Sequence, residues 1–295
     1  MFSAYIGVYS RNSQAASSLM LYLIAVSLIW AFSFGLIKGR LAGLDSAFIS
    51  TVRLGLALVV FLPFLRVRGL PRRTLFALLG IGAVQFGFMY LAYNESFNYL
   101  SAYQVALFTI TTPILVTLLA DTFDRTFRLR ALLAALLAVL GTAVMVFQAP
   151  GGTLKGFLLV QLSNAAFATG QICYRRVRAW PGTPRDRDIF ALLYAGAFAV
   201  TLAALSMKNG LSVTLTAVHL LTLLYLGIIA SGLGFFLWNI GATRVNAGTL
   251  AVMNNAKVPL AVACSLLFFG ESADLPRLVA SLALLGAAVW LAEKR

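Results

Sequence analysis

Residues 219–240 read HLLTLLYLGIIASGLGFFLWNI, a run of 22 residues without Asp, Glu, Lys or Arg. A helix needs about 20 apolar residues to cross the hydrocarbon core of a bilayer, so this run predicts a transmembrane helix. The same test applied along the rest of the chain predicts nine further spans: 19–37, 46–65, 73–93, 101–120, 128–147, 155–174, 188–206, 247–268 and 275–292. We therefore expect an all-α integral membrane protein with ten transmembrane helices.

The composition agrees with this architecture. Of the 295 residues, 61% are hydrophobic and only 11% are charged, whereas a soluble globular chain is about 45–50% apolar and about 25% charged. Ten spans use roughly 200 residues, and the remainder is too short for an appended catalytic or DNA-binding domain of ordinary size.

The net charge of +14 is a signal of topology. If ten helices cross the membrane, 16 of the 23 Lys and Arg residues fall on segments that share one side, and five fall on the other. Cytoplasmic loops of membrane proteins carry such an excess, so both termini are expected in the cytoplasm. A nucleic-acid partner is excluded, because the basic residues lie in short clusters between apolar runs and not on one exposed face.

The two halves of the chain resemble each other. The matched segments are 30–35 with 165–170, 79–88 with 226–235, Pro113 with Pro259, and 140–144 with 285–289. They predict two units of five helices, 19–147 and 155–293. Because five crossings are an odd number, the second unit must be inverted relative to the first, as in many secondary transporters. The matched Gly35, Gly170, Pro113 and Pro259 are expected to have gating or structural roles.

At this level the chain resembles the EamA branch of the drug/metabolite transporter superfamily. The resemblance rests on Arg53-Leu54 in the second span, on Pro113 and Pro259, and on Phe269-Gly270-Glu271 after the ninth span. It covers about residues 19–293 and implies a multi-pass exporter in the bacterial inner membrane. Within the branch, the chain looks most like YddG-type bacterial exporters of aromatic amino acids. The first half lacks the Phe-Gly-Glu feature, since Arg125 stands at the matching distance from Pro113.

Lys257 is the sharpest candidate for cargo binding. It lies near the middle of the span 247–268, where burying a lysine costs about 2.5–3.5 kcal/mol on insertion scales. Asn254 lies three residues earlier on the same helical face, and Pro259 frees a nearby carbonyl. The lysine could hold a substrate carboxylate, take part in proton coupling, or act as structural glue. Arg53 lies near enough to the outer end of its span to extend toward the membrane surface, and its match to the family's arginine in the second span implies a structural or gating role.

Five further residues are candidates for lining a substrate cavity. Gln85, Gln161 and Asn164 carry amides that their own helices cannot satisfy, although bonding between helices is an alternative role. Trp30 and Tyr90 belong to an abundant aromatic set that suits aromatic or amphipathic solutes, although packing is the commoner role for such residues.

The sequence predicts a secondary transporter that exports small amphipathic metabolites, above all amino acids including aromatic ones, by alternating access through a central cavity. Its partners would be the lipid bilayer and the small-molecule substrate, with proton coupling left open. No catalytic constellation, metal-ligand cluster, cofactor motif or P-loop is present in the sequence. A broad-specificity exporter of cationic drugs and a membrane-embedded enzyme are the alternatives. The first would need an intramembrane Asp or Glu, and the second a polar active site at a membrane face.

Overall fold

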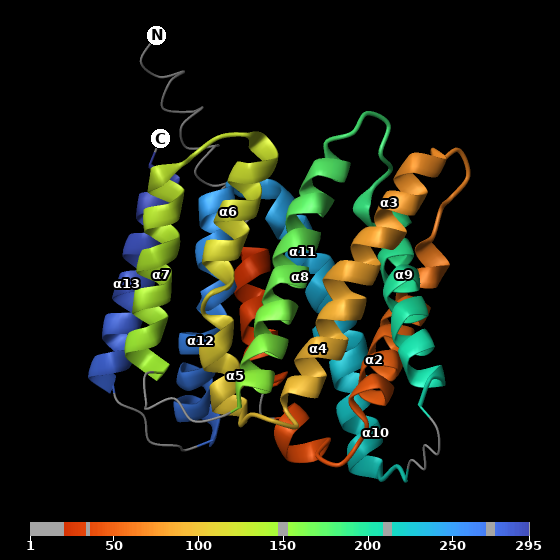
Figure 1. The fold of residues 1–295 in the computed structure, drawn as a ribbon, viewed down its shortest axis with the longest axis horizontal. Helices are drawn as coiled ribbons and strands as arrows, with labels where there is room; N and C mark the ends of the chain where they lie inside the picture. The colour runs from red at the N-terminus through yellow and green to blue at the C-terminus, as the bar shows by residue number, and fades with distance from the viewer. Residues whose placement is uncertain (1–20, 34–35, 147–152, 209–213, 270–274, 295) are drawn as a thin grey trace.

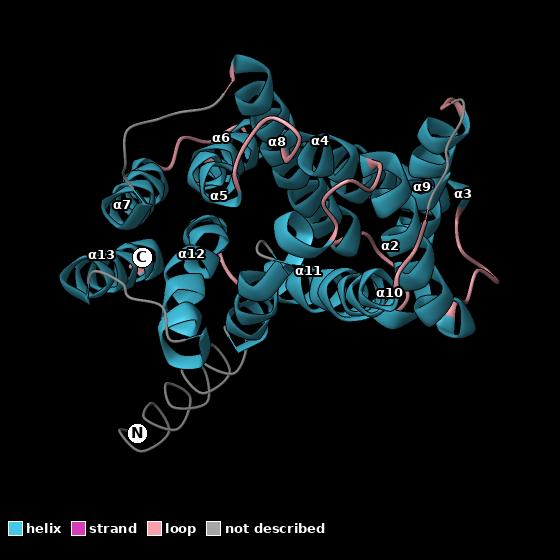
Figure 2. Ribbon diagram, turned by 90° about the horizontal axis from the view of Figure 1, so that it is seen from below, coloured by secondary structure: helices cyan, strands magenta, loops and turns pink. Residues whose placement is uncertain are grey.

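The computed structural model describes residues 21–33, 36–146, 153–208, 214–269 and 275–294, and within them every regular element is a helix. The helices run side by side from one end of the molecule to the other (Figure 1). Helices α7 and α13 form one edge of the bundle, and α3 and α9 form the opposite edge (Figures 1 and 2).

The first half contains the helical span Leu21–Arg40, of which residues 34 and 35 are outside the described residues. It is followed by α2 (Ser46–Phe61), η1 (Leu62–Phe64), α3 (Arg72–Gly82), η2 (Ala83–Phe88), α4 (Met89–Ser96), α5 (Ala102–Thr109), α6 (Thr112–Asp124) and α7 (Leu129–Val146). The second half contains α8 (Leu154–Arg178), α9 (Asp186–Ser206), α10 (Ala217–Leu224), η3 (Tyr225–Leu233), α11 (Gly234–Arg244), α12 (Ala247–Phe269) and α13 (Leu275–Glu293).

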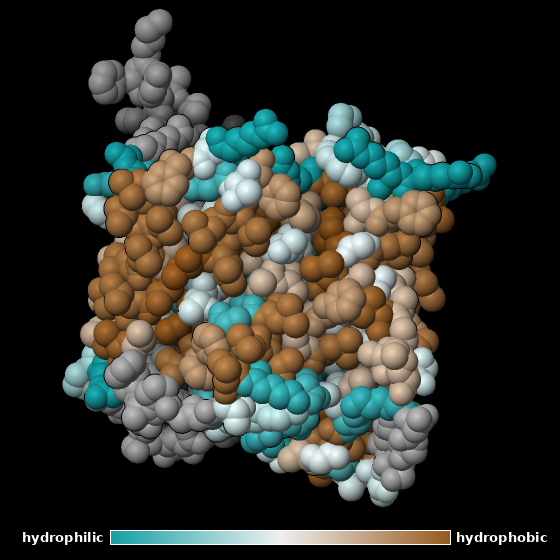
Figure 3. Space-filling view, viewed as in Figure 1, coloured by the Kyte–Doolittle hydropathy of each residue, from teal (hydrophilic) through white to brown (hydrophobic). Residues whose placement is uncertain are grey.

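Seven helices among the described residues are long and apolar enough to cross a membrane. They are Leu21–Arg40, Ser46–Phe64, Arg72–Ser96, Leu107–Asp124, Asp186–Ser206, Ala217–Arg244 and Leu275–Glu293. Apolar side chains form a broad belt between two polar ends on the face shown in Figure 3. The ranges 128–147, 155–174 and 247–268 are also helical where described, but their crossing, the count of ten and the orientation of the termini stay predictions.

We call the end that holds the α2–α3, α6–α7 and α8–α9 connections the arginine-rich end; it is uppermost in Figure 1. The C-terminal end of α13 lies there too. At the opposite end, Lys208 pairs with Asp45, the N-cap residue of α2, at 2.5 Å. Burial alone would raise the pKa of Asp45, but the hydrogen bond from Lys208 and those from the backbone N–H groups of Phe48 and Ala47 lower it overall.

The expected span 101–120 is broken in two. Helix α5 ends at Thr109, and α6 begins at Thr112 with Pro113 in its first turn. Proline has no N–H to donate and fits best at a helix start, so the chain restarts its helix there. The break leaves carbonyl groups that other helices must satisfy, an arrangement tolerated at membrane depth where protein or a cavity surrounds it.

Two other helices contain a segment of π-helix at matched places in the two halves. Segment η2 lies between α3 and α4, and η3 lies between α10 and α11. π-helical turns are rare in proteins overall, and those that occur are often found at functional sites.

Several helices that the sequence pairs as repeat mates pack against each other: α2 with α9, α6 with α12, and α7 with α13. Glycines permit the closest approaches, as small residues do in membrane helices generally. A Cβ on Gly170 would lie 2.1 Å from the Cβ of Gln85 in η2, so α8 has no room for a side chain there. Gly35 lies outside the described residues, and its comparison with Gly170 stays a prediction.

Candidate functional site

A cavity opens in the interior of the bundle and contains about 580 Å³ of atom-free space, counted out to its mouth. Four of the residues predicted to bind cargo line this cavity: Trp30, Tyr90, Asn164 and Lys257. They come from the Leu21–Arg40 span, α4, α8 and α12, so the fold gathers them from both halves of the chain.

Lys257 points its ammonium group toward this cavity. The Nζ atom lies 5.8 Å from the ring centre of Trp30, within the range of a weak cation–π contact. No carboxylate of the described residues forms an ion pair with Lys257, since each ion pair found there lies toward one of the two polar ends. The cavity therefore offers a cation without a resident counter-ion.

Arg53 is the second cation of the cavity. Its side chain is buried and does not extend toward the membrane surface, so that expectation was wrong. The reason is a set of non-local partners: Nη2 donates to the Tyr90 hydroxyl at 2.5 Å, and Nε donates to the Ser231 hydroxyl at 3.2 Å. The guanidinium also lies 4.2 Å from the Tyr90 ring centre. Its Nη1 is buried without a hydrogen-bond partner, which leaves a donor for an anionic ligand.

The π-helical segment η3 positions this arginine. Within it, the Ser231 hydroxyl donates to the Leu226 carbonyl, five residues earlier, at 2.6 Å, and lies 2.9 Å from the Tyr90 hydroxyl. The Tyr194 hydroxyl contacts the carbonyl oxygens of Ser231 and Gly232 at 2.9 and 2.6 Å. Ser231 is thus fixed by its own helix and by two tyrosines, and it holds Arg53 in one orientation.

Three aromatic side chains, Trp30, Phe167 and Phe235, line the same cavity as the two cations. The Trp30 ring centre lies 5.3 Å from that of Phe235 and 5.8 Å from that of Phe167, both edge-to-face. Both phenylalanines line the cavity. The Trp30 indole N–H is occupied by the Ala230 carbonyl at 2.9 Å, so the tryptophan presents its ring to the cavity and not its polar group.

Asn164 completes the lining beside the break between α5 and α6. Its Nδ2 donates to the Phe108 carbonyl at 2.9 Å and to the Thr111 hydroxyl at 3.2 Å. Gln161 donates to the same carbonyl at 3.0 Å, and Asn255 donates to the Ile110 carbonyl at 3.0 Å. These amides satisfy the carbonyl groups that the break around Pro113 releases.

Three candidates lie outside the lining. Gln85 donates to Asn239 in α11 at 2.8 Å, Gln161 bonds to the α5–α6 break, and the Asn254 amide turns back to the Leu250 carbonyl at 2.8 Å. The structure therefore does not bring Asn254 and Lys257 together through a hydrogen bond. Pro259 lies inside α12, two residues beyond Lys257, and Pro113 starts α6.

Reasoning from the sequence did not predict Arg53, Phe167 and Phe235 as cavity residues. Arg53 carried a signal, because an arginine inside an apolar span needs a polar partner. The partners Tyr90 and Ser231 lie 37 and 178 positions away. The sequence alone does not predict contacts between residues so far apart.

The family of EamA-like transporters matches the chain twice, over residues 17–147 and 154–292. The chain belongs to this family. Among its relatives is a probable biotin transporter from Pseudomonas aeruginosa, 44% identical over 276 residues that cover 92% of this chain and 96% of the relative. Biotin transporters from Salmonella typhimurium and Escherichia coli K12 are each 38% identical over 279 residues, with 93% of both chains covered.

A solved structure described only as the crystal structure of a protein matches this EamA-like transporter with a TM-score of 0.75. The alignment has 18% sequence identity and covers 94% of this chain and 97% of the other. At that identity the match establishes the fold alone.

These relatives bear on the predicted cargo. The superfamily and the transport activity are as expected, but the relatives are named for biotin and not for aromatic amino acids.

Proposed function

We propose that this EamA-like transporter carries biotin across the bacterial inner membrane as a secondary transporter. The observation that supports this cargo most directly is the identity of 44% and 38% to proteins named as biotin transporters, over more than nine-tenths of the chain. The cavity chemistry supports it independently.

Biotin has one negative charge, at the carboxylate that ends its aliphatic chain, and an uncharged bicyclic ureido head. The carboxylate would lie between Lys257 and the guanidinium group of Arg53, which can donate a charge-assisted hydrogen bond. The fused rings would pack on Trp30, Phe167 and Phe235. A cation of the kind expected for a drug exporter would meet two positive charges and no acid among the described residues of this lining.

Transport would proceed by alternating access between two inverted five-helix units, 19–147 and 155–293. The two separate family matches support this division. Arg53 belongs to the first unit, whereas Lys257 and Ser231 belong to the second. A carboxylate held by both cations would therefore bridge the two units.

The test is flux of radiolabelled biotin into liposomes that contain the purified protein. Saturable flux above that of protein-free liposomes is expected, together with strong competition by unlabelled biotin and weaker competition by biotin methyl ester, which lacks the charge. Phenylalanine and tryptophan should compete weakly. Flux of tryptophan without flux of biotin would reject this cargo and restore the amino acid hypothesis.

A further inference from the structure

A second cavity lies at the arginine-rich end, enclosed by α6, α8 and the first residues of α7 and α12. It contains about 1,240 Å³ of atom-free space, counted out to its mouth. The polar residues in its lining are Asp124, Arg128, Arg175, Arg176 and Asn246, and Trp180 adds one aromatic ring. Asp124 is the only acid among these lining residues.

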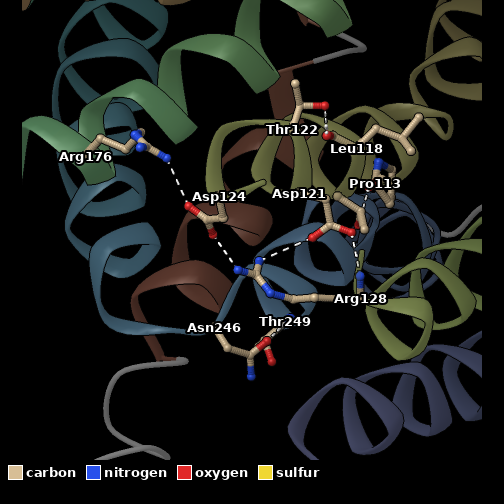
Figure 4. Close-up of polar contacts among 10 residues, drawn as sticks. Pro113, Leu118, Asp121, Thr122, Asp124, Arg128, Arg176, Asn246 and Thr249 are labelled. Carbon is tan, nitrogen blue, oxygen red and sulfur yellow. Dashed lines mark hydrogen bonds and ion pairs between the residues drawn. The ribbon is translucent and has the colours of Figure 1, made fainter. Parts of the chain in front are cut away.

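The positive charges of this cavity exceed what its acid can pair. Asp124 forms ion pairs with Arg128 at 2.5 Å and with Arg176 at 2.9 Å, so that one carboxylate is shared by two guanidinium groups (Figure 4). Arg128 lies also 3.4 Å from Asp121, in the turn of α6 before Asp124. These contacts join α6, α7 and α8 at one point.

Arg175 stands apart from this network. Among the described residues it forms no ion pair within 4.0 Å, and its Nη1 is buried with no hydrogen-bond partner. The positive-inside rule accounts for arginines that face water beside a membrane. It does not account for a guanidinium nitrogen withdrawn from water and left without an acceptor, which costs free energy.

The second cavity continues the route of the central one. Helices α6, α8 and α12 line both: they contribute Thr112, Asn164 and Lys257 to the central cavity and other residues to the second. Along α8, Arg175 follows Asn164 by eleven residues, which is about 16 Å at a rise of 1.5 Å per residue. Buried side chains of the same helices, such as Val116 and Ala168, fill the interval.

We propose that the second cavity is an oxyanion-binding site for a carboxylate or phosphate group. The bound oxyanion pairs with the guanidinium group of Arg175 and competes with Asp124 for Arg128 and Arg176. Guanidinium groups suit this role because their planar donor sets match carboxylate and phosphate oxygens. The argument for this site does not depend on which cargo the central cavity binds, since the two cavities share no lining residue.

The test uses the full chain with Cys173 and Cys264 replaced by alanine and a fluorophore on Ala179→Cys, at the rim of the cavity. Inorganic phosphate is titrated at constant ionic strength. A saturable signal is expected in the parent protein and in the control Arg185→Gln, whose arginine is exposed and outside the lining. Arg175→Gln should weaken the apparent affinity at least tenfold.

A second variant guards against misfolding. Asp124→Asn removes the competing carboxylate, so phosphate should bind several-fold more tightly, an outcome that a damaged protein would not give. Equal titrations of Arg175→Gln and Arg185→Gln, or no tightening in Asp124→Asn, would overturn the proposal.

Two further measurements distinguish a lipid headgroup from a cargo carboxylate as the natural occupant of the site. In nanodiscs that contain phosphatidylglycerol, a lipid headgroup in the site would suppress the phosphate signal, which would return in nanodiscs of phosphatidylcholine. If a cargo carboxylate is the occupant, biotin should displace phosphate equally in both lipids, and Lys257→Gln should leave this displacement unchanged.

Discussion

At the scale of single residues, the central cavity contains two cationic side chains, Arg53 and Lys257, that differ in how firmly their neighbours hold them. Arg53 is fixed by hydrogen bonds to Tyr90 and Ser231. Lys257 has only the distant face of Trp30 beside it. The arginine is thus a rigid donor and the lysine an adjustable one, which suits recognition of a carboxylate at the end of a flexible chain.

Lys257→Gln should weaken biotin transport far more than transport of biotin methyl ester. Truncating one partner of a buried charge pair costs about 2–5 kcal/mol, so the loss of apparent affinity for biotin should exceed tenfold. Flux of both compounds into proteoliposomes measures the difference. Lys294→Gln, which alters an exposed lysine at the end of α13, is the control. If the variant transports biotin and the ester with equal, small losses, the lysine is structural.

Ser231→Ala should reduce biotin affinity without preventing insertion. The change removes the acceptor of the Arg53 Nε donor while the contact with Tyr90 stays, and one such buried hydrogen bond is worth about 1–3 kcal/mol. We expect a KM several-fold higher with a smaller change in maximal rate. Ser206→Ala, at an exposed serine at the end of α9, should behave as the parent. A normal KM in Ser231→Ala would show that Arg53 does not need this partner.

At the scale of helices, the sequence was sufficient for the positions of seven apolar spans among the described residues and insufficient for their interruptions. Pro113 marks a break that was expected only as a proline within one span, because proline can kink a helix or restart it. The composition of the segment 83–88 does not distinguish a π-helix from an α-helix. The same holds for η3, whose Ser231 bonds to Arg53 of another helix. Candidate amides were recognised as needing partners, but which carbonyl or amide each meets depends on contacts 50 or more residues away.

Gly170→Ala should destabilise the packing of α8 on η2. Its Cβ would lie 2.1 Å from that of Gln85, and overpacking of this kind costs about 1–3 kcal/mol. Gly80→Ala is the matched control, because a Cβ there meets nothing within 4 Å and alanine favours helix over glycine. Thermal unfolding in detergent should show a lower Tm for Gly170→Ala alone. Equal Tm values would mean that the two helices separate more easily than their contact suggests.

At the scale of the whole molecule, the orientation in the membrane is the prediction on which the mechanism depends. Cysteines placed at Arg68 and Arg185, both exposed and at the arginine-rich end, should react with an impermeant maleimide only from the cytoplasm. A cysteine at Asn98, in the turn before α5, should react only from outside. Reaction of all three from one side would contradict the expected topology and the inverted repeat with it.

Arg53 also has an electrical consequence. Arg53 stays with the protein while its ligand moves, so a biotin anion that pairs with it during transport would still carry one negative charge per molecule across the membrane. Moving one charge through a potential of 100 mV is worth about 2.3 kcal/mol. Net biotin flux should therefore respond to a voltage imposed with potassium and valinomycin. One-for-one exchange of labelled for unlabelled biotin transfers no net charge, and its extent should not change with that voltage.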